Sequence, residues 1–234
     1  MPLHINQKLM KNNKGFIFDL DGVIVDTARY HFLAWRRLAN SVGVDFTEEQ
    51  NEQLKGVSRV KSLEKILTWG NIELPERTFM ELMAKKNNDY MEHVHQMDES
   101  EILPDVVKIL DHLTSINQPI ALGSASQNAR TILKKVNLYR SFDAIVDGTN
   151  VTKAKPDPEV FLRAAALLEI TPEQCIVFED SVSGIQAANT AKMISIGIGD
   201  KTVLHEADYV FNNFTEIDVN FLNSLLENEL KIDA

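Results

Sequence analysis

The stretch that decides the fold is Gly15-Phe16-Ile17-Phe18-Asp19-Leu20-Asp21-Gly22-Val23, near the N-terminus. It begins with a short apolar run, Gly15–Leu20, and ends in acidic and turn-forming residues, which is the pattern of a buried parallel strand. Similar runs follow at Ile120–Ser124, Ala144–Asp147, Cys175–Glu179 and Ile194–Ile198. Stretches with helical periodicity lie near 105–116, 127–137, 157–169 and 181–191. This alternation predicts an α/β fold with a doubly wound parallel sheet, Rossmann-like, covered by helices on both faces.

Residues 28–98 interrupt this alternation, because they contain almost no strand-like run and several amphipathic helical patterns. A helical segment of this length, placed directly after the first strand, is too long to be a simple crossover. We therefore predict a helical cap domain over 28–98, inserted into an α/β core formed by 1–27 and 99–234. The two connections, near Thr27–Ala28 and Leu103–Pro104, would act as hinges. Residues 1–14 are assigned no role.

The composition limits the classes of partner. The chain has 34 acidic and 24 basic side chains and a net charge of −10, which argues against a broad nucleic-acid surface but does not exclude a small anionic substrate. No apolar run approaches the roughly 18–20 residues that cross a bilayer. The single cysteine, Cys175, excludes an internal disulfide and fits a reducing compartment. We expect a cytoplasmic protein with no nucleic-acid or membrane partner.

Two carboxylates close the first predicted strand, Asp19 and Asp21. Ligands of parallel sheets gather at the carboxyl ends of the strands, and a turn at Gly22 can bring both side chains to one crevice. One carboxylate can then attack a substrate while the other transfers a proton. Taken alone, Asp-x-Asp-Gly is more often an ordinary turn.

A second acidic pair, Glu179-Asp180, closes the strand Cys175–Glu179. Mg²⁺ prefers oxygen ligands, usually one or two carboxylates together with water and substrate phosphate. Two acidic strand ends at one crevice would supply such a site. The alternative, about equally favoured, is that these residues cap the helix that starts near Val182.

The remaining polar candidates suit a phosphate. Ser124-Ala125-Ser126-Gln127-Asn128 follows a strand and opens a helix, whose N–H groups attract anions. Lys155 precedes Pro156, which we expect at the first position of the next helix, and can offer a point charge. Taken singly, a serine at a helix start is usually only a cap, and a loop lysine is usually solvated.

The order of these elements is more specific than any one of them. Asp-x-Asp-Gly, then serine, then Lys-Pro, then Glu-Asp stand at the ends of consecutive strands, and in this order the chain resembles the haloacid dehalogenase superfamily of phosphotransferases from Gly15 onward. Three segments of the predicted cap further resemble the sugar-phosphate mutases of that superfamily: Asp26–Trp35, Gln53–Arg59 and Lys85–Asn87. Gln127 departs from the pattern, since a lysine is expected there.

The resemblance implies roles for the strand-end residues. Asp19 would be the nucleophile that becomes an aspartyl phosphate, and Asp21 the general acid/base. Ser124 and Lys155 would bind the transferring phosphoryl group. The implied cofactor is Mg²⁺, and its implied ligands are Asp19, Asp21 through its backbone carbonyl, and Asp180, with Glu179 in support.

The resemblance also implies a substrate-binding set. Arg59 would bind the non-reacting phosphate with two parallel N–H donors, and His31 would orient Asp21. The whole set is Thr27, His31, Trp35, Leu54, Gly56, Val57, Ser58, Arg59, Lys86, Ala125, Ser126 and Asn128. Without the resemblance, Arg59 reads as a solvated cation, His31 as a surface residue and Trp35 as cap core.

The function implied is the interconversion of β-D-glucose 1-phosphate and glucose 6-phosphate through a β-glucose 1,6-bisphosphate intermediate, by a monomer whose partners are small sugar phosphates. One alternative is a Mg²⁺-dependent sugar-phosphate phosphatase on the same scaffold. Another is a non-catalytic phospho-acceptor module similar to a receiver domain. The inserted cap and the second acid, Asp21, argue against that module, which needs neither.

Overall fold

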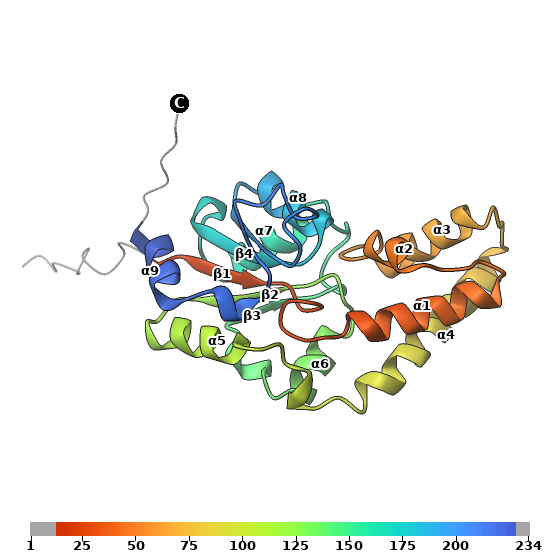
Figure 1. Ribbon diagram of the computed structural model, residues 1–234, viewed down its shortest axis with the longest axis horizontal. Coiled ribbons are helices and arrows are strands. Elements are labelled where there is room, and N and C mark those ends of the chain that lie inside the picture. The colour runs from red at the N-terminus through yellow and green to blue at the C-terminus, as the bar shows by residue number, and fades with distance from the viewer. Residues whose placement is uncertain (1–12, 228–234) are drawn as a thin grey trace, which may run out of the picture.

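The computed structural model describes residues 13–227 of the 234-residue chain, so most of the first fourteen residues lie outside it. Its two parts, an α/β core and a helical cap, lie side by side along the long axis (Figure 1). The cap comes from the helices between the first and second strands. The predicted α/β fold with a helical insertion is therefore confirmed.

The core is built on a six-stranded sheet in which every pairing is parallel. Its strands are β1 (Gly15–Phe18), β2 (Ile120–Gly123), β3 (Ala144–Val146), β4 (Cys175–Glu179), β5 (Ile194–Ile198) and β6 (Tyr209–Phe211). Their order is β3-β2-β1-β4-β5-β6. The order reverses at β1, so a crevice opens beyond its carboxyl end, next to that of β4. The predicted acidic strand ends are thus neighbours.

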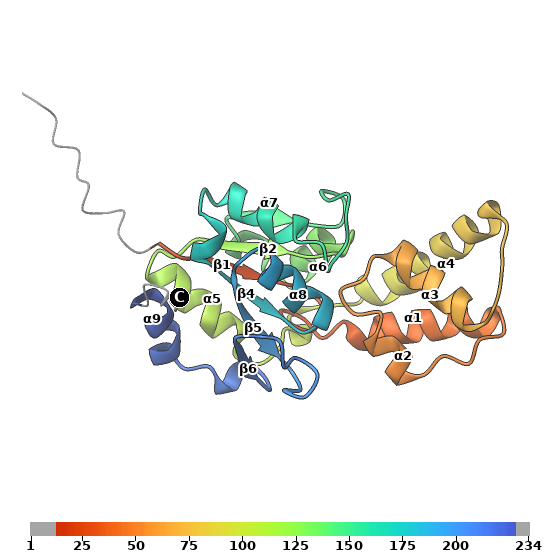
Figure 2. The ribbon, with the colours of Figure 1, turned by 90° about the horizontal axis from the view of Figure 1, so that it is seen from above.

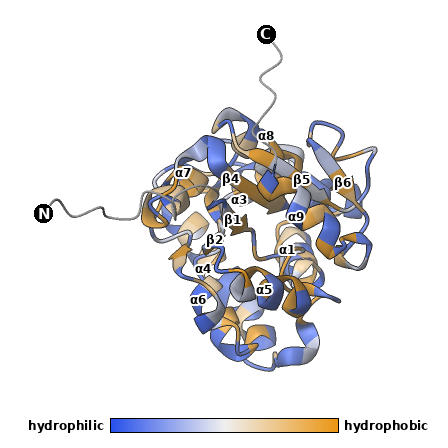
Figure 3. Cartoon of the chain, turned by 90° about the vertical axis from the view of Figure 1, so that its left-hand side faces the viewer, coloured by the Kyte–Doolittle hydropathy of each residue, from blue (hydrophilic) through white to orange (hydrophobic). Residues whose placement is uncertain are grey.

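Helices cover both faces of the sheet, because consecutive strand residues point to opposite sides. Phe16 and Phe18 are buried on the face covered by α5 (Val106–Ser115), α6 (Ala129–Lys135) and α9 (Val219–Glu227). Ile17 is buried on the other face, under α7 (Glu159–Leu167) and α8 (Val182–Thr190). Figure 3 shows apolar residues concentrated on the strands and on the helix sides that face them.

The cap consists of α1 (Ala28–Ser41), α2 (Glu48–Glu52), α3 (Arg59–Trp69) and α4 (Glu76–Val94). It has a hydrophobic core of its own, to which α1, α3 and α4 and the loops between them contribute. The helices α1 and α4 run alongside one another and lead from and to the core (Figure 2). The entering and leaving segments are bonded together, since Asp26 N donates to Glu101 O at 2.9 Å and Leu103 N to Ile24 O at 3.0 Å.

Two helices of the core begin later than predicted. The helix expected to start at Pro156 starts at Glu159, because Asp157 Oδ1 accepts a hydrogen bond from Glu159 N at 3.0 Å. The expectation that Pro156 occupies the first helical position is therefore wrong. The helix expected near residue 127 starts at Ala129, since the side chains of Ser124 and Ser126 form two successive turns before it.

Two core elements go beyond the prediction, the edge strand β6 and the helix α9. Among residues 13–227, no helix combines the length and apolar character needed to cross a membrane.

Candidate active site

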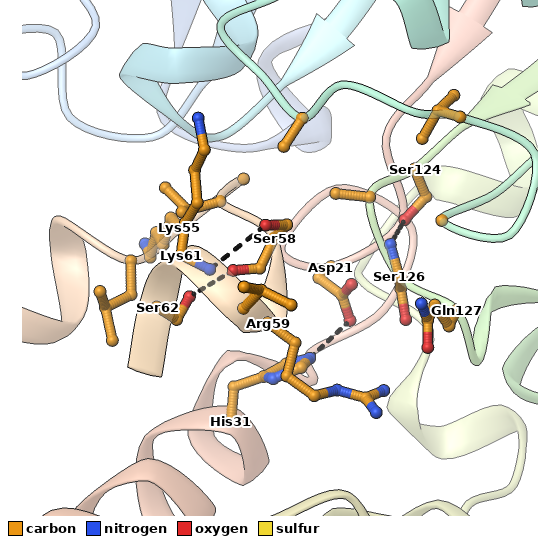
Figure 4. Close-up of a pocket in the computed structure, with 18 of the residues that line it drawn as sticks. Asp21, His31, Lys55, Ser58, Arg59, Lys61, Ser62, Ser124, Ser126 and Gln127 are labelled. Carbon is orange, nitrogen blue, oxygen red and sulfur yellow. Dashed lines mark hydrogen bonds and ion pairs between the residues drawn. The ribbon is translucent and has the colours of Figure 1, made fainter. Parts of the chain in front are cut away.

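A cavity of about 950 Å³ lies between the cap and the carboxyl edge of the sheet. Figure 4 shows cap residues such as His31 and Arg59 on one side of it and Asp21, Ser124 and Ser126 on the other. Its walls contain fifteen of the predicted site residues: Asp19, Asp21, His31, Trp35, Leu54, Gly56, Val57, Ser58, Arg59, Lys86, Ser124, Ala125, Ser126, Asn128 and Asp180. Thr27, Lys155 and Glu179 are buried behind this surface.

Asp19 follows the last residue of β1 and is buried at the base of the cavity. Its Oδ1 accepts a hydrogen bond from Lys155 Nζ at 2.5 Å, and its Oδ2 accepts one from the backbone N of Asp21 at 3.0 Å. Burial raises the pKa of Asp19 well above its usual range, and the nearby carboxylates of Glu179, Asp21 and Asp180 add to this against the opposing effect of Lys155. Two hydrogen bonds therefore hold the Asp19 carboxyl group in place, but Lys155 alone does not offset the burial and the neighbouring negative charges.

Lys155 is a buried cation, not the solvated loop residue of the alternative interpretation. Its Nζ donates to Glu179 Oε2 at 2.7 Å as well as to Asp19. Burial lowers the pKa of Lys155, but the two carboxylates more than offset this and raise it above the ordinary value. Glu179 is fixed in turn by Ser181, whose Oγ donates to Glu179 Oε1 at 2.6 Å.

Carboxylate oxygens of Asp19, Glu179 and Asp180 lie within 4.8 Å of one another, so these residues could hold a metal ion. Burial, together with the nearby Glu179, raises the pKa of Asp180 to about 7, although Lys55 opposes this. A buried group of oxygen donors with too little positive charge fits a hard divalent cation. The helix-capping alternative for the acidic pair is not needed, because Ser181 is the N-cap of α8 and accepts from Gly184 N at 3.1 Å.

The turn after β1 brings Asp180 and Asp21 together. Gly22 has a φ of +81°, and a Cβ at this position would lie 2.2 Å from Asp180 Oδ2. Only glycine combines this backbone conformation with so close an approach. The turn that the sequence suggested is thus itself part of the site.

Asp21 has a different environment from Asp19, although the two are the same residue type. Thr27 Oγ1 donates to Asp21 Oδ1, and His31 Nε2 lies 3.6 Å from the same oxygen. Burial alone would raise the pKa of Asp21, but His31, Thr27 and Lys86 together lower it below the ordinary value. Both contacts come from the segment that enters the cap, so the position of the cap and the state of Asp21 are linked.

Lys86 lies behind His31, with Nζ 2.9 Å from His31 Nδ1. An ammonium group can only donate, so Nδ1 then accepts and Nε2 carries the hydrogen that faces Asp21. The Lys86 side chain is buried between the rings of Trp35 and Tyr90, at 4.6 and 4.8 Å. Burial lowers the pKa of Lys86 to about 7, and Arg59 contributes in the same direction. Trp35 both lines the cavity and belongs to the hydrophobic core of the cap.

The segment from Ser124 to Asn128 borders the cavity on the core side. Ser124 Oγ accepts from Ser126 N at 3.1 Å, and Ser126 Oγ accepts from Asn128 N at 3.2 Å, so the segment coils tightly before α6. The Asn128 amide donates to Asn87 Oδ1 of the cap at 3.1 Å. Gln127, at the position where the resemblance leads one to expect lysine, is exposed and adds no charge.

Arg59 is the first residue of α3, which Ser58 caps by accepting from Lys61 N at 3.4 Å. Arg59 is half-buried in the site, and this burial lowers its pKa. It is therefore not a freely solvated cation. Leu54, Gly56 and Val57 precede it on the same wall of the cavity.

The sequence-based predictions missed four residues at or beside the site. Lys55 Nζ lies 3.5 Å from Asp180 Oδ2, and Tyr90 stacks on His31 with ring centroids 4.2 Å apart. Two hydrogen bonds cross the boundary between cap and core, one between Asn87 and Asn128 and one between Ser183 and the Lys55 carbonyl. Lys55 and Asn87 stand inside quoted motif segments, and Tyr90 follows Lys86 by one helical turn. No signal in the sequence pointed to Ser183.

Comparisons with known proteins agree with this geometry. A family model described as haloacid dehalogenase-like hydrolase matches residues 16–198. The chain is 41% identical to beta-phosphoglucomutase of Bacillus subtilis strain 168, over 90% of this chain and 94% of that protein. It is 31% identical to a phosphorylated carbohydrates phosphatase of Thermotoga maritima, over 90% and 98% of the two chains.

A solved structure leads to the same family. The beta-phosphoglucomutase structure from Clostridium difficile superposes with a TM-score of 0.88 at 38% identity, covering 92% of this chain and 97% of that one. From its family-model match, its relatives and its fold, this chain belongs to the haloacid dehalogenase-like hydrolase family.

Proposed function

We propose that the protein is a β-phosphoglucomutase, which interconverts β-D-glucose 1-phosphate and glucose 6-phosphate. The observation that carries this proposal is that two separate groups of side chains suited to phosphate stand at one cavity. Asp19 and Ser124 line it at the strand ends with Lys155 buried behind them, and Arg59 of the cap faces it together with Ser126 and Asn128 of the core. A mutase needs both, because its bisphosphate intermediate has two phosphates. The similarity to the Bacillus subtilis and Clostridium difficile enzymes supports the same conclusion.

The proposed cycle begins with a phosphoryl group on Asp19. The O6 hydroxyl of β-glucose 1-phosphate gives its proton to Asp21, the O6–phosphorus bond forms, and the bond from phosphorus to Asp19 breaks. The product of this half is β-glucose 1,6-bisphosphate. The proximity of Asp21 and Asp19 to one cavity suits this division of tasks, since one carboxylate handles the proton and the other the phosphoryl group.

In the second half the bisphosphate binds in the reversed orientation. Asp19 attacks the phosphorus on O1, the bond from O1 to phosphorus breaks, and Asp21 returns its proton to O1. Glucose 6-phosphate leaves, and Asp19 again carries the phosphoryl group. Lys155 is aimed at Asp19, where it stabilises the charge that spreads over the phosphoryl oxygens.

We propose Mg²⁺ as the cofactor, held by Asp19, Asp180 and the backbone carbonyl of Asp21, with Glu179 in support. When bound, it neutralises charge on the transferring phosphoryl group. Lys155 stays between Asp19 and Glu179, so Glu179 keeps this lysine in position. The raised pKa values of Asp19 and Asp180 are the observation that calls for added positive charge.

The second candidate is a sugar-phosphate phosphatase that uses the same Asp19 and Asp21. The similarity to the phosphatase of Thermotoga maritima over nearly the whole chain favours it. The two functions differ in which molecule receives the phosphoryl group of Asp19. A mutase must exclude water and bind the distal phosphate, whereas a phosphatase must admit water.

The test measures both products in one experiment. The protein is given β-glucose 1-phosphate, Mg²⁺ and a catalytic amount of β-glucose 1,6-bisphosphate, and glucose 6-phosphate and inorganic phosphate are followed together. We expect glucose 6-phosphate to exceed phosphate by a wide margin. Rapid phosphate release without glucose 6-phosphate would instead establish the phosphatase.

Arg59 variants sharpen this test. Arg59→Ala and Arg59→Lys should both lose most mutase activity, because lysine keeps the charge but not the two parallel donors. The rate at which the same variants hydrolyse a substrate with a single phosphate should change far less. The control is Arg77→Ala, which removes an exposed arginine of α4 that pairs only with Glu81 among the described residues.

A further inference from the structure

The cap rests on the core through the turn between β4 and α8. Ser183, the second residue of α8, donates from its Oγ to the backbone carbonyl of Lys55 at 3.1 Å. Lys55 lies in the cap segment that leads to Arg59. This contact joins residues 128 positions apart, one in the core and one in the cap.

The fit between the two surfaces is close. Gly56 has a φ of +67°, and a Cβ there would lie 2.5 Å from both Ser181 Oγ and Ser183 Oγ. The backbone of the cap loop therefore lies directly on the two hydroxyl groups. A side chain at position 56 would lift the loop away from the core.

The same turn holds the catalytic lysine in place. Ser181 Oγ lies 3.3 Å from Ser183 Oγ and donates to Glu179 Oε1, whose other oxygen accepts from Lys155 Nζ. Ser183 has one hydroxyl hydrogen, which can go either to the Lys55 carbonyl or to Ser181 Oγ. When the cap moves away, the Ser183 hydrogen bond can return to the core, so the hydroxyl is satisfied in both positions.

We propose that Ser183 is a positioning residue that holds the cap loop closed over Asp19 and so limits the access of water to the aspartyl phosphate. The inference rests on the function proposed above. A second link, Lys55 Nζ to Asp180 Oδ2 at 3.5 Å, is less suited to this task. A cation bound at Asp180 would compete with the Lys55 ammonium, whereas it leaves the bond between hydroxyl and carbonyl untouched.

The test is Ser183→Ala, which removes the hydroxyl and nothing else. Alanine is favourable within α8, and the N-cap Ser181 stays in place, so the variant should fold. We expect inorganic phosphate released per glucose 6-phosphate formed to rise about two- to tenfold, the effect of one hydrogen bond of this type. The KM for β-glucose 1-phosphate should change less than this ratio. Ser183→Thr, which keeps the hydroxyl group, should restore the wild-type ratio of inorganic phosphate to glucose 6-phosphate.

A second measurement follows the loop itself. Deuterium exchange in a peptide spanning residues 53–59 of the substrate-free protein should be faster in Ser183→Ala than in the wild type. The matched control is Ser224→Ala, which removes a surface serine hydroxyl of α9, bonded to Phe221 O, far from the cavity.

The outcomes separate the two proposals. An unchanged ratio of products in Ser183→Ala overturns the water-exclusion role, whatever the exchange shows. If the wild type forms no glucose 6-phosphate, the proposed function fails, and the exchange measurement alone decides whether Ser183 holds the loop. Equal exchange in variant and wild type then rejects the positioning role as well.

Discussion

Asp19 and Asp21, two positions apart in the sequence, show how one residue type acquires two different electrostatic environments. Asp19 is buried among other carboxylates, which together with burial raise its pKa. Asp21 is surrounded by the donors Thr27 and His31 and the cation Lys86, which together lower its pKa. Neighbouring acids whose pKa values are pushed apart are typical of catalytic pairs. The difference arises because residues of the core surround Asp19, whereas His31 and Lys86 of the cap act on Asp21.

The proton-transfer role that we propose for Asp21 predicts the behaviour of Asp21→Asn. The amide keeps the shape but cannot take up a proton, so mutase turnover should fall by about 10²- to 10⁴-fold. Asp19 should still accept a phosphoryl group from acetyl phosphate, because that leaving group needs no proton. Activity assays and intact-mass measurement of the phosphorylated protein check the two halves. Full turnover in Asp21→Asn would remove Asp21 from the mechanism.

Lys86 makes stability depend on pH. Its pKa is about 7 in the folded protein, against 10.5 ordinarily, so the unfolded chain binds more protons between these values. The stability that the wild type gains over Lys86→Met should therefore increase as the pH rises from about 7 toward 10.5. The limiting slope is about 1.4 kcal/mol per pH unit. Urea unfolding of both proteins at pH 7 and pH 9 measures it, and a constant difference between them would contradict the predicted protonation change.

At the scale of elements, the β4–α8 turn is packed so tightly that its residue choices are few. A Cβ on Gly184 would lie 2.0 Å from Glu179 Cδ. The helix therefore approaches β4 closely enough to seal Glu179 from solvent and hold its carboxylate against Lys155. The turn that starts α8 thus also supports the position of Lys155.

Gly184→Ala should displace Glu179. Overpacking of this kind typically costs about 1–3 kcal/mol of unfolding free energy, and the displaced Glu179 would leave Lys155 with one partner in place of two. We expect a lower melting temperature together with a loss of kcat that exceeds the change in KM. Gln186→Ala, on the exposed side of the same helix, is the control. Unaltered stability and kcat would show that the turn tolerates the added methyl group.

The sequence predicted the elements whose signal is local. Buried strands such as Cys175–Glu179 are continuous apolar runs, and their parallel order placed Asp19 and Asp180 at one edge. The edge strand β6 has three partly exposed residues and gives too short a pattern to recognise. The start of α7 depended on Asp157 accepting from a backbone N–H, which proline at position 156 obscured.

The site was predictable only in part for a related reason. Residues at strand ends follow from topology, and the cap residues followed from a resemblance to known sequences. The contact of Ser183 with Lys55 depends on how the separately packed cap and core meet, and the contact of Tyr90 with His31 depends on how α4 packs against α1 within the cap. No periodicity in the chain encodes either packing arrangement, so neither contact was foreseen.

At the scale of the whole molecule, the site exists only where the cap and the sheet come together. Asp19, Glu179 and Asp180 come from the core, whereas His31, Arg59 and Lys86 come from the cap. The core side therefore gathers negative charge and the cap side positive charge. A phosphorylated sugar with a divalent cation complements both sides.

Removal of the metal ion should be visible in thermal stability. The pKa of Asp180 is raised from its ordinary value of 3.8 to about 7. Without a cation, ionisation of this carboxyl group therefore destabilises the folded protein as the pH rises from about 3.8 to 7. Mg²⁺ should raise the melting temperature strongly at pH 8 and weakly at pH 5, where protons compete for the same oxygens. Asp180→Asn should remove most of this difference, and Asp200→Asn, at an exposed carboxylate, should not. A metal effect independent of Asp180 would contradict the proposed site.

The paired connections between core and cap have a consequence for engineering. Because Asp26 and Glu101 are already joined by a hydrogen bond, excision of the helices between them leaves two ends that a very short splice can close. The sheet and Asp19, the proposed nucleophile, would be retained in such a miniature protein. Grafting a different helical module at the same junction should change which substrate is bound, while Asp19, Lys155, Glu179 and Asp180 of the core keep their positions.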